Sequence, residues 1–302
     1  MQSIPAAIAF SAFLCAAAAA QTPRTPDGHP DLQGVWVADF ITPLERPEKI
    51  ATLVVPPESI AETVKTMTTD PGKVYDPDFD YFFPNTLLTI NGEARSSWVV
   101  APDSGRLPMT ALARSAAKYD NGFDNPEERP GGERCVSGLG HPPMHAISSV
   151  IPSQIVQTPA ALVFVTEDTD STRIVDLSGP KRPDAIRTRM GSSSGRWEGD
   201  TLVVETAGFS APDPAGVLMR DAVALSEASR VTERFTLISQ DELLYRFTVE
   251  DPALYDRPWL AEYMMTRNRD RLHEYACHEG NRAMENILTA ARLGKQKPSP
   301  DR

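Results

Sequence analysis

Short runs of apolar and β-branched residues recur from about residue 154 onward, with turn-forming clusters between them. The links between the runs, such as residues 239–241, are too short for helical crossovers. The pattern therefore predicts an antiparallel meander in which strands that follow one another in sequence are neighbours in the sheet. The predicted strands are residues 154–157, 162–167, 173–177, 201–206, 230–238, 243–250, 259–266 and 272–277.

Apolar and polar side chains alternate within several of these runs. Leu243, Tyr245 and Phe247 fall on one face of their strand, and polar residues fall on the other face, so one face of the sheet is expected to be buried. An uninterrupted up-and-down order favours closure, because closure removes both sheet edges. The predicted fold class is mainly β, an up-and-down antiparallel barrel, and barrels of this size can hold one small ligand.

The first half of the chain is less regular, and its many prolines indicate long connections laid over a compact core. An early strand is predicted at residues 34–37, a helix after the capping pattern Ser59-x-x-Glu62, and a second helix near residues 110–117. Apolar residues at helical spacing before Gly294 predict a C-terminal helix. The predicted domains are a signal peptide at 1–20, an N-terminal strand with an irregular cap at 21–152, the barrel with its C-terminal helix at 153–294, and a tail at 295–302.

Residues 1–20 contain no charged side chain and carry an apolar stretch from Ile8 to Leu14. With the small residues Ala18 and Ala20 at its end, this segment is typical of a cleavable secretory signal, so we expect a periplasmic or secreted protein. A buried N-terminal helix is the alternative. No later stretch approaches the roughly 20 consecutive apolar residues that a membrane-spanning helix needs, so no membrane insertion is expected.

Composition narrows the class of partner. The 302 residues are 41% apolar and 24% charged, which is typical of a globular chain. The formal net charge of -11 repels phosphate backbones, so nucleic acid is not an expected partner. The expected partner is a small apolar or aromatic molecule.

Removal of the predicted leader leaves two cysteines, Cys135 and Cys277, in a compartment where thiols tend to pair. The alternatives are unpaired structural thiols, or a metal site in which His141, His145 and His278 join the two sulfur atoms. The spacing of these residues matches no common zinc pattern. We therefore predict a disulfide and no metal.

Three strings of residues carry a family resemblance. They are QIVQTP at residues 154–159, GRWEGDTLVV at 195–204 and EYACHEGN at 274–281, and together they resemble a large family of exported bacterial proteins. The resemblance implies export and a barrel of the calycin type, the architecture of lipocalins. Gly34-x-Trp36 is similar to the G-x-W signature of lipocalins.

The chain departs from the family pattern at three places. Residues 149–152 replace a Tyr-Asn-Asn string, the His that usually precedes the arginine matching Arg173 is missing, and Ser192 stands where an Asp is usual. If these polar groups serve a family reaction, this chain has lost or altered it.

Two short motifs suggest chemistry without the expected context. The Gly191-x-Ser193-x-Gly195 spacing fits a hydrolase nucleophile elbow, but a strand and not a helix follows, so we interpret the segment as a hairpin loop. Three aspartates at residues 76–80 alternate as in a calcium loop that lacks its closing Glu. The aromatic residues around them, including Tyr81 and Phe82, form either a lid over a cavity or an anchor to the barrel wall.

Carboxylates within the predicted strands are candidates for catalysis. Glu233 shares a face with Val231, and Glu167 shares a face with Val163, so either carboxylate can point into the barrel. A buried carboxylate is either paired or has a raised pKa, which suits a general acid or base. Structural ion pairs are the alternative, with the nearby residues Arg134, Arg173, Arg196 and Arg234.

The strand predicted at residues 272–277 supplies the main site hypothesis. Glu274 and His278 fall on the face opposite Cys277, so a disulfide outside the barrel would turn both inward, where they could exchange a proton. Arg173 or Arg196 would then balance developing negative charge. The alternative is a histidine that caps the end of the strand.

These residues predict an exported enzyme that performs cofactor-free acid–base chemistry, such as elimination, isomerisation or hydration, on an apolar or phenolic substrate inside the barrel. The alternatives are a non-catalytic periplasmic carrier and an interaction module with a filled barrel. The predicted catalytic residues are Glu274, His278, Arg173, Glu167, Glu233 and His145, and the predicted ligand-binding residues are Tyr81, Phe82, Arg196, Trp197 and Tyr245.

Overall fold

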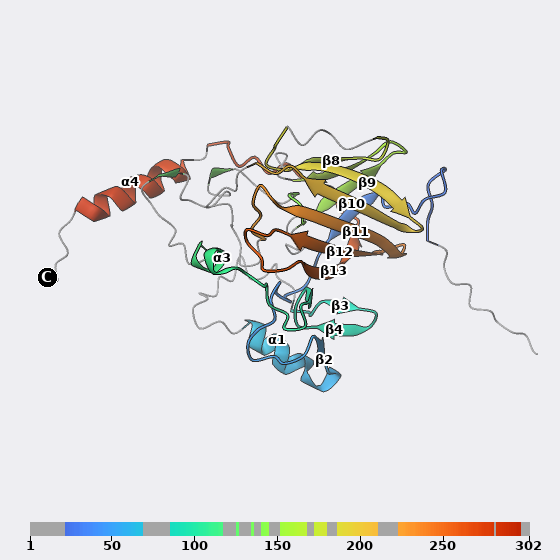
Figure 1. The fold of residues 1–302 in the computed structure, drawn as a ribbon, viewed down its shortest axis with the longest axis horizontal. Coiled ribbons are helices and arrows are strands. Elements are labelled where there is room, and N and C mark those ends of the chain that lie inside the picture. Colours follow the sequence, from blue (N-terminus) through green and yellow to red (C-terminus); the bar gives the residue numbers. More distant parts are fainter. Residues whose placement is uncertain are drawn as a thin grey trace, which may run out of the picture.

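The structure is a computed structural model in which a β-barrel carries a smaller sheet and helix at its side (Figure 1). Helix α4 (Ala283–Gln296) lies away from the strands. Among the residues that the structure describes, no helix is both long and apolar enough to cross a lipid bilayer. The described residues are 22–68, 85–116, 125–126, 134–135, 140–144, 152–167, 172–179, 186–210, 223–280 and 282–296.

The barrel wall is a closed ring of nine strands, which follow one another around the ring in sequence order. Strand β1 pairs with both β6 and β13 and so closes the ring. The predicted fold class, a mainly-β antiparallel barrel, is confirmed. The wall strands are β1 (Gly34–Val37), β6 (Ser153–Gln157), β7 (Ala161–Thr166), β8 (Arg173–Asp176), β9 (Ser192–Glu198), β10 (Thr201–Ala207), β11 (Arg230–Ser239), β12 (Glu242–Glu250) and β13 (Trp259–Asn268).

One pair in the ring departs from the antiparallel order. A ring with an odd number of strands cannot reverse direction at every step, so at least one pair of neighbours must be parallel. That pair is β8 and β9, in which Val175 is opposite Ser193. A parallel pair needs a long return connection, and residues 177–191 provide it.

The sequence analysis correctly identified seven of the eight strands it predicted, and the exception is residues 272–277. This segment is irregular because β1 occupies the position beside β13: Val35 is opposite Asn268 and Val37 is opposite Thr266. The early strand, which the sequence analysis assigned to the cap, is therefore part of the barrel wall.

Strand β9 replaces the hairpin loop that we predicted for the serine-rich segment. It pairs with β10 from Ser192 to Glu198, and Ser193 faces the interior, where its Oγ lies 2.8 Å from Thr206 Oγ1. A Cβ atom at Gly195 would lie 2.7 Å from the Leu177 side chain, so glycine permits the close approach of the segment that follows β8. Ser193 is thus a buried strand residue and does not occupy the strand-to-helix turn of a nucleophile elbow.

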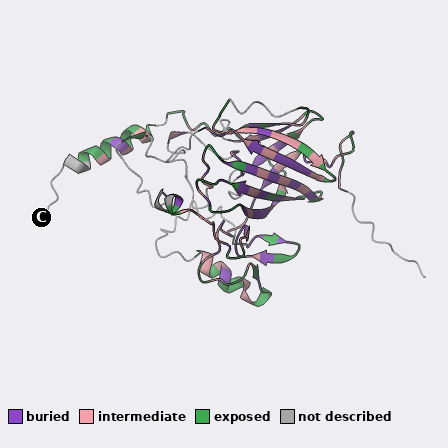
Figure 2. Cartoon of the chain, in the orientation of Figure 1, coloured by how far each residue is buried: buried purple, intermediate pink, exposed green. Residues whose placement is uncertain are grey.

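The interior of the barrel is packed with large side chains, and the purple strands of Figure 2 mark this burial. Along β11 and β12 the buried residues alternate with more exposed ones, as the period of a strand requires. Each large apolar side chain removed from water stabilises the fold by about 1.5–3 kcal/mol. The largest fully buried side chains include Trp36, Phe164, Phe235, Tyr245, Phe247, Trp259 and Tyr263.

A small sheet and two helices lie in the N-terminal half of the chain. The sheet has the order β2 (Val54–Val55), β4 (Glu93–Arg95) and β3 (Thr89–Ile90), and it packs through Val55, Leu87 and Ala94 against α1 (Ile60–Thr68). The short strand β5 (Val99–Ala101) joins this region to β13. The remaining elements are the 3-10 turn η1 (Pro57–Ser59) and helix α3 (Ala111–Ala116), which Thr110 caps.

Residues 22–33 cross one end of the barrel. The His29 ring stacks on Trp197 of β9 with 4.7 Å between ring centroids, and Arg24 pairs with Asp200 in the β9–β10 turn. Gln157 accepts a hydrogen bond from the Leu32 backbone N–H. This end of the barrel is therefore covered by the chain itself.

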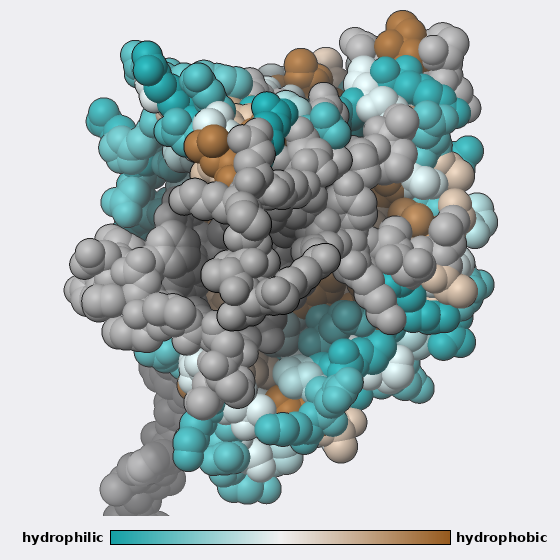
Figure 3. Space-filling view, turned by 90° about the vertical axis from the view of Figure 1, so that its left-hand side faces the viewer, coloured by the Kyte–Doolittle hydropathy of each residue, from teal (hydrophilic) through white to brown (hydrophobic). Residues whose placement is uncertain are grey.

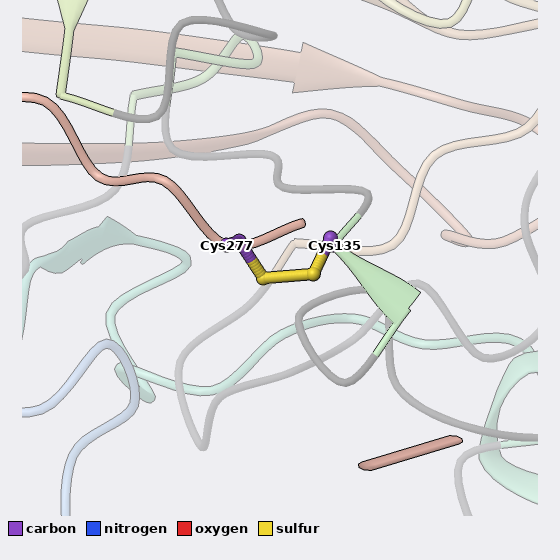
Figure 4. The surroundings of a disulfide bond; sticks show 2 residues. All are labelled: Cys135 and Cys277. Atoms are coloured by element: carbon purple, nitrogen blue, oxygen red, sulfur yellow. A yellow bond between two sulfur atoms is a disulfide. The ribbon is translucent and has the colours of Figure 1, made fainter. Parts of the chain in front are cut away.

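Cys135 and Cys277 form the predicted disulfide, with 5.5 Å between their Cα atoms (Figure 4). The bond joins the segment before β6 to the irregular segment after β13. Because the two sulfur atoms are bonded to each other, they cannot serve as thiolate ligands, and the alternative metal site built on these two cysteines is excluded.

We expect loss of this disulfide to lower the free energy of unfolding by about 2–5 kcal/mol, because the unfolded chain regains the freedom of a long loop. The Cys135→Ala/Cys277→Ala variant should show this loss in urea denaturation. The wild-type protein in reductant provides the control and should match the variant. An unchanged midpoint in both would show that the bond does not constrain the unfolded state.

Candidate functional site

A charged pair lies inside the barrel. Arg173 of β8 and Glu233 of β11 make two hydrogen bonds, of 2.5 and 2.9 Å, and both side chains are almost completely buried. Two strands, β9 and β10, separate β8 from β11 along the wall, so the pair spans the interior. A buried pair is tolerated only when its geometry is good and its remaining polar atoms find partners.

Aromatic rings surround this pair. The Arg173 guanidinium lies over the Phe164 ring at 4.6 Å from its centroid, and Phe164 contacts Phe235. Phe235, Tyr245 and Tyr263 are register partners on adjacent strands, with 4.9 Å between neighbouring centroids. The rings exclude water from the pair and so strengthen its electrostatic attraction.

Two tyrosine hydroxyls extend the polar group. Tyr245 donates a hydrogen bond of 2.8 Å to Glu233 and accepts one of 2.9 Å from the Met144 backbone N–H. Tyr263 donates one of 2.9 Å to the Met144 carbonyl oxygen. We call Arg173, Glu233, Tyr245 and Tyr263 the polar centre. The two tyrosines of this centre thus bind the backbone N–H and the backbone carbonyl of Met144, a residue that belongs to no strand.

We call residues 140–144, which end at Met144, the plug segment. Backbone N–H groups inside a protein must be satisfied, and an irregular segment has few partners for them. Pro142 and Pro143 carry no N–H, and Tyr245 satisfies that of Met144. His141 anchors the segment, since its Nε2 lies 2.8 Å from the Arg189 carbonyl oxygen.

Burial and charge fix the protonation of Tyr245, Tyr263 and Arg173. Burial, and next the charge of Glu233, raise the pKa of Tyr245 and of Tyr263 well above the ordinary value. Burial alone would lower the pKa of Arg173, but attraction and hydrogen bonds from Glu233 outweigh it and raise that pKa. The two phenols therefore stay neutral and the guanidinium stays charged near neutral pH.

Two hydrogen-bond donors inside the barrel have no acceptor. Arg173 Nε and Trp259 Nε1 are buried and make no hydrogen bond. Trp259 faces the interior from β13, where it packs against Phe247 and Tyr255. Among the described interior residues, the unpartnered side-chain atoms are thus donors and not acceptors.

The structure does not bring Glu274 and His278 to this centre. Both are exposed and lie in the irregular segment where a strand was predicted. Glu167 also lies outside the interior, because Leu162, Phe164 and Thr166 form the inner face of β7. Its carboxylate accepts a hydrogen bond from the His273 backbone N–H and so holds the segment after β13.

Of the predicted ligand-binding residues, Tyr245 belongs to the polar centre and Trp197 to the covered end of the barrel. Arg196 faces outward and pairs with Glu198 and Glu205 on the barrel surface. Exposed pairs of this kind contribute about 0–1 kcal/mol. On the face shown in Figure 3, the described side chains are mainly hydrophilic, and the hydrophobic ones form separate small groups.

The predicted residues Tyr81, Phe82 and His145 and the aspartates of residues 76–80 lie outside the described residues. The sequence analysis missed Tyr263 and Met144. Tyr263 has a signal in the sequence, because it alternates with Trp259, Ala261 and Met265 on a predicted strand. Met144 has none, because no periodic pattern places an irregular segment inside a barrel.

No family model, no curated protein and no solved structure matches the chain. The resemblance of the three sequence strings to a family of exported proteins therefore remains a prediction.

We expect Glu233→Gln to lower the free energy of unfolding by about 3–5 kcal/mol, because it leaves the buried charge of Arg173 without a counter-charge. Urea denaturation measures the loss. The matched control, Glu274→Gln on the surface, should stay within about 0.5 kcal/mol of wild type. Equal effects of the two variants would mean that the buried pair does not support the fold.

The tyrosines predict alkaline sensitivity. Since the pKa values of Tyr245 and Tyr263 are raised in the folded state, their contribution to stability is complete below the unfolded value of about 10 and declines as pH rises above it. In a titration to high pH, the phenolate absorbance of these two tyrosines should therefore rise at the same pH at which the protein unfolds. The double variant Tyr245→Phe/Tyr263→Phe lacks both phenols, so its difference from wild type identifies their absorbance. Ionisation of these two tyrosines in a protein that stays folded would contradict the prediction.

Proposed function

We propose that the protein binds a small, largely apolar or aromatic molecule inside the barrel, at the polar centre. The observation that carries this proposal is the pair of hydrogen bonds that join Tyr245 and Tyr263 to the backbone N–H and carbonyl of Met144. Rigid strands present fixed hydrogen-bonding groups in an aromatic interior, which is the usual composition of a small-molecule site. The backbone groups that the two tyrosines bind belong to the plug segment, which contributes no strand to the barrel wall.

A ligand would reach the polar centre by replacing the plug segment. The Met144 side chain is buried among core residues, so withdrawal of the plug segment would free both polar partners and apolar volume. Irregular segments open at lower free energy than the strands they cover. The plug segment would thus close the barrel in the absence of ligand and withdraw when a ligand binds.

A carrier is the form of this function that the geometry supports best. The two phenols and the guanidinium of the polar centre hold their protonation states near neutral pH, which suits recognition through fixed donors and acceptors. Under this proposal the ligand is released from the protein without any chemical change to the ligand.

An acid–base enzyme is the second candidate, favoured by the 2.8 Å hydrogen bond from Tyr245 to Glu233. In this version Glu233 accepts a proton from a bound apolar or phenolic substrate, Tyr245 orients the carboxylate, and Arg173 balances developing negative charge. The reaction would be an isomerisation in which Glu233 returns the proton to another atom of the same substrate, or an elimination in which Glu233 passes the proton to the departing group, so that the carboxylate is regenerated. Recovery of an altered molecule by wild type but not by Glu233→Gln would favour the enzyme.

Export to the periplasm or the medium belongs to the same proposal. The disulfide between Cys135 and Cys277 is compatible with an oxidising compartment, where structural disulfides persist.

We expect saturable binding of N-phenylnaphthylamine, a neutral aromatic dye, together with faster hydrogen exchange at the Met144 amide. The reason is that a ligand at the polar centre displaces the hydrogen bond from that amide to Tyr245. His141→Ala loosens the plug segment and should tighten dye binding about fivefold, since less free energy opposes its withdrawal. Fluorescence titration and exchange measured by mass spectrometry provide both readouts.

The matched control is His273→Ala, an exposed histidine outside the plug segment, which should bind the dye as wild type does. Absence of saturable binding, or binding that leaves exchange at Met144 unchanged, would overturn the proposal.

A further inference from the structure

We propose that the ligand of the polar centre is an uncharged N-acyl derivative of an L-α-amino acid with an apolar side chain. This inference rests on the binding function proposed above and names its ligand class. It is drawn from the place where the two hydrogen bonds end on the chain. The N–H bound by Tyr245 and the carbonyl bound by Tyr263 lie on either side of one Cα atom, that of Met144.

The hydrogen bonds require a donor and an acceptor group on either side of one tetrahedral carbon. The Tyr245 hydroxyl donates to Glu233 and accepts the Met144 N–H at 2.9 Å, and Tyr263 donates to the Met144 carbonyl at 2.9 Å. These two groups belong to successive peptide bonds. A single trans amide directs its N–H and its carbonyl to opposite sides, so one amide group fills only one of the two positions.

The recognised unit is one residue long. Both hydrogen bonds between the polar centre and the described plug segment end on Met144, and Pro143 before it carries no N–H. A single amino acid residue with both ends capped therefore contains the whole pattern.

The interior requires that both ends of the ligand be uncharged. Arg173 and Glu233 neutralise each other through two hydrogen bonds, so neither provides a free counter-charge. A free α-amino group is mostly protonated at neutral pH and a free carboxyl group is ionised, and burial of either charge without a partner is strongly unfavourable. Acylation gives a neutral nitrogen that keeps its N–H, and an ester or amide gives a neutral carbonyl.

The third substituent of the Cα atom sets the configuration. Met144 is only 2% exposed, and its side chain belongs to the main hydrophobic core. With the N–H and the carbonyl bound by the two tyrosines, a change of configuration exchanges the positions of the side chain and the α-hydrogen. An L residue therefore keeps both hydrogen bonds and buries its side chain, whereas a D residue gives up one or the other.

Five methionine derivatives test the hydrogen-bonding pattern and the configuration by displacement of N-phenylnaphthylamine. The matching compound is N-acetyl-L-methionine methyl ester. Its N-methyl analogue lacks the N–H, and N-(3-methylsulfanylpropyl)acetamide, a single secondary amide, lacks the ester carbonyl. Each of these two should bind about fivefold more weakly than the L ester, as expected for the loss of one net hydrogen bond.

The other two derivatives test handedness and charge. N-acetyl-D-methionine methyl ester should bind about tenfold more weakly than the L ester, because it cannot bury its side chain while it makes both hydrogen bonds. N-acetyl-L-methionine, which carries a free carboxylate, should not displace the dye.

Two tyrosine variants assign each ligand group to its partner. Tyr245→Phe removes the acceptor for the N–H and should abolish the difference between the L ester and its N-methyl analogue. Tyr263→Phe removes the donor to the carbonyl and should abolish the difference between the L ester and the acetamide. Ratios are compared because either change also loosens the plug segment. The matched control is Tyr255→Phe, a buried tyrosine outside the polar centre whose hydroxyl donates to the Ala224 carbonyl, and it should preserve all ratios.

The outcomes separate this inference from the binding function. If the dye binds and raises hydrogen exchange at Met144, but the L ester does not displace it or binds no more tightly than the other derivatives, the barrel binds ligands and the ligand class is wrong. If neither the dye nor any derivative binds, or if binding leaves exchange at Met144 unchanged, both proposals fail. The wild-type series decides the ligand class even if a tyrosine variant does not fold.

Discussion

The ion pair between Arg173 and Glu233 sets the conditions that the rest of the barrel interior must meet. Two opposite charges removed from water are costly unless good geometry and further hydrogen bonds offset the loss of hydration, and removal of one partner leaves the other as an unpaired buried charge. The pair therefore needs the bidentate contact, the Phe164 ring over the guanidinium, and the hydroxyl of Tyr245 on the carboxylate. Because Arg173 and Glu233 lie on strands that are separated by two others, the same contact joins parts of the wall that are not neighbours in the sheet.

The ring of strands accommodates this contact through an unusual pair. With nine strands, one parallel pair is unavoidable, and it falls between β8, which carries Arg173, and β9. The first four residues of β9, from Ser192 to Gly195, are small, and Gly195 leaves room for Leu177 and Val175 of the preceding segment. The close approach of β8 to β9 thus depends on the serine-rich segment that the sequence analysis interpreted as a hairpin loop.

How far the sequence predicts this molecule depends on how strongly each segment alternates. Strands β11 and β12 alternate clearly, so both the strands and the inward position of Glu233 followed from period two. Strand β7 has apolar residues on both faces, so alternation could not decide whether Glu167 points inward, and it lies on the outer face. The serines of β9 have low strand propensity, and only pairing with β10 makes them a strand. Closure by β1 is a long-range pairing that no local pattern reveals, and it displaces the segment that carries Glu274.

The plug segment shows how an irregular chain can bring few backbone donors into a barrel. Pro142 and Pro143 carry no N–H, and the polar centre satisfies both backbone groups of Met144. A ligand that replaced Met144 with one donor for Tyr245 and one acceptor for Tyr263 would restore both hydrogen bonds, so the exchange would change the number of satisfied groups by little. The balance between the closed and the liganded barrel would then depend on the apolar group that replaces the Met144 side chain and on the cost of exposing the plug segment. Selectivity would come from the two tyrosines, and affinity from the fit of the apolar group among the aromatic rings.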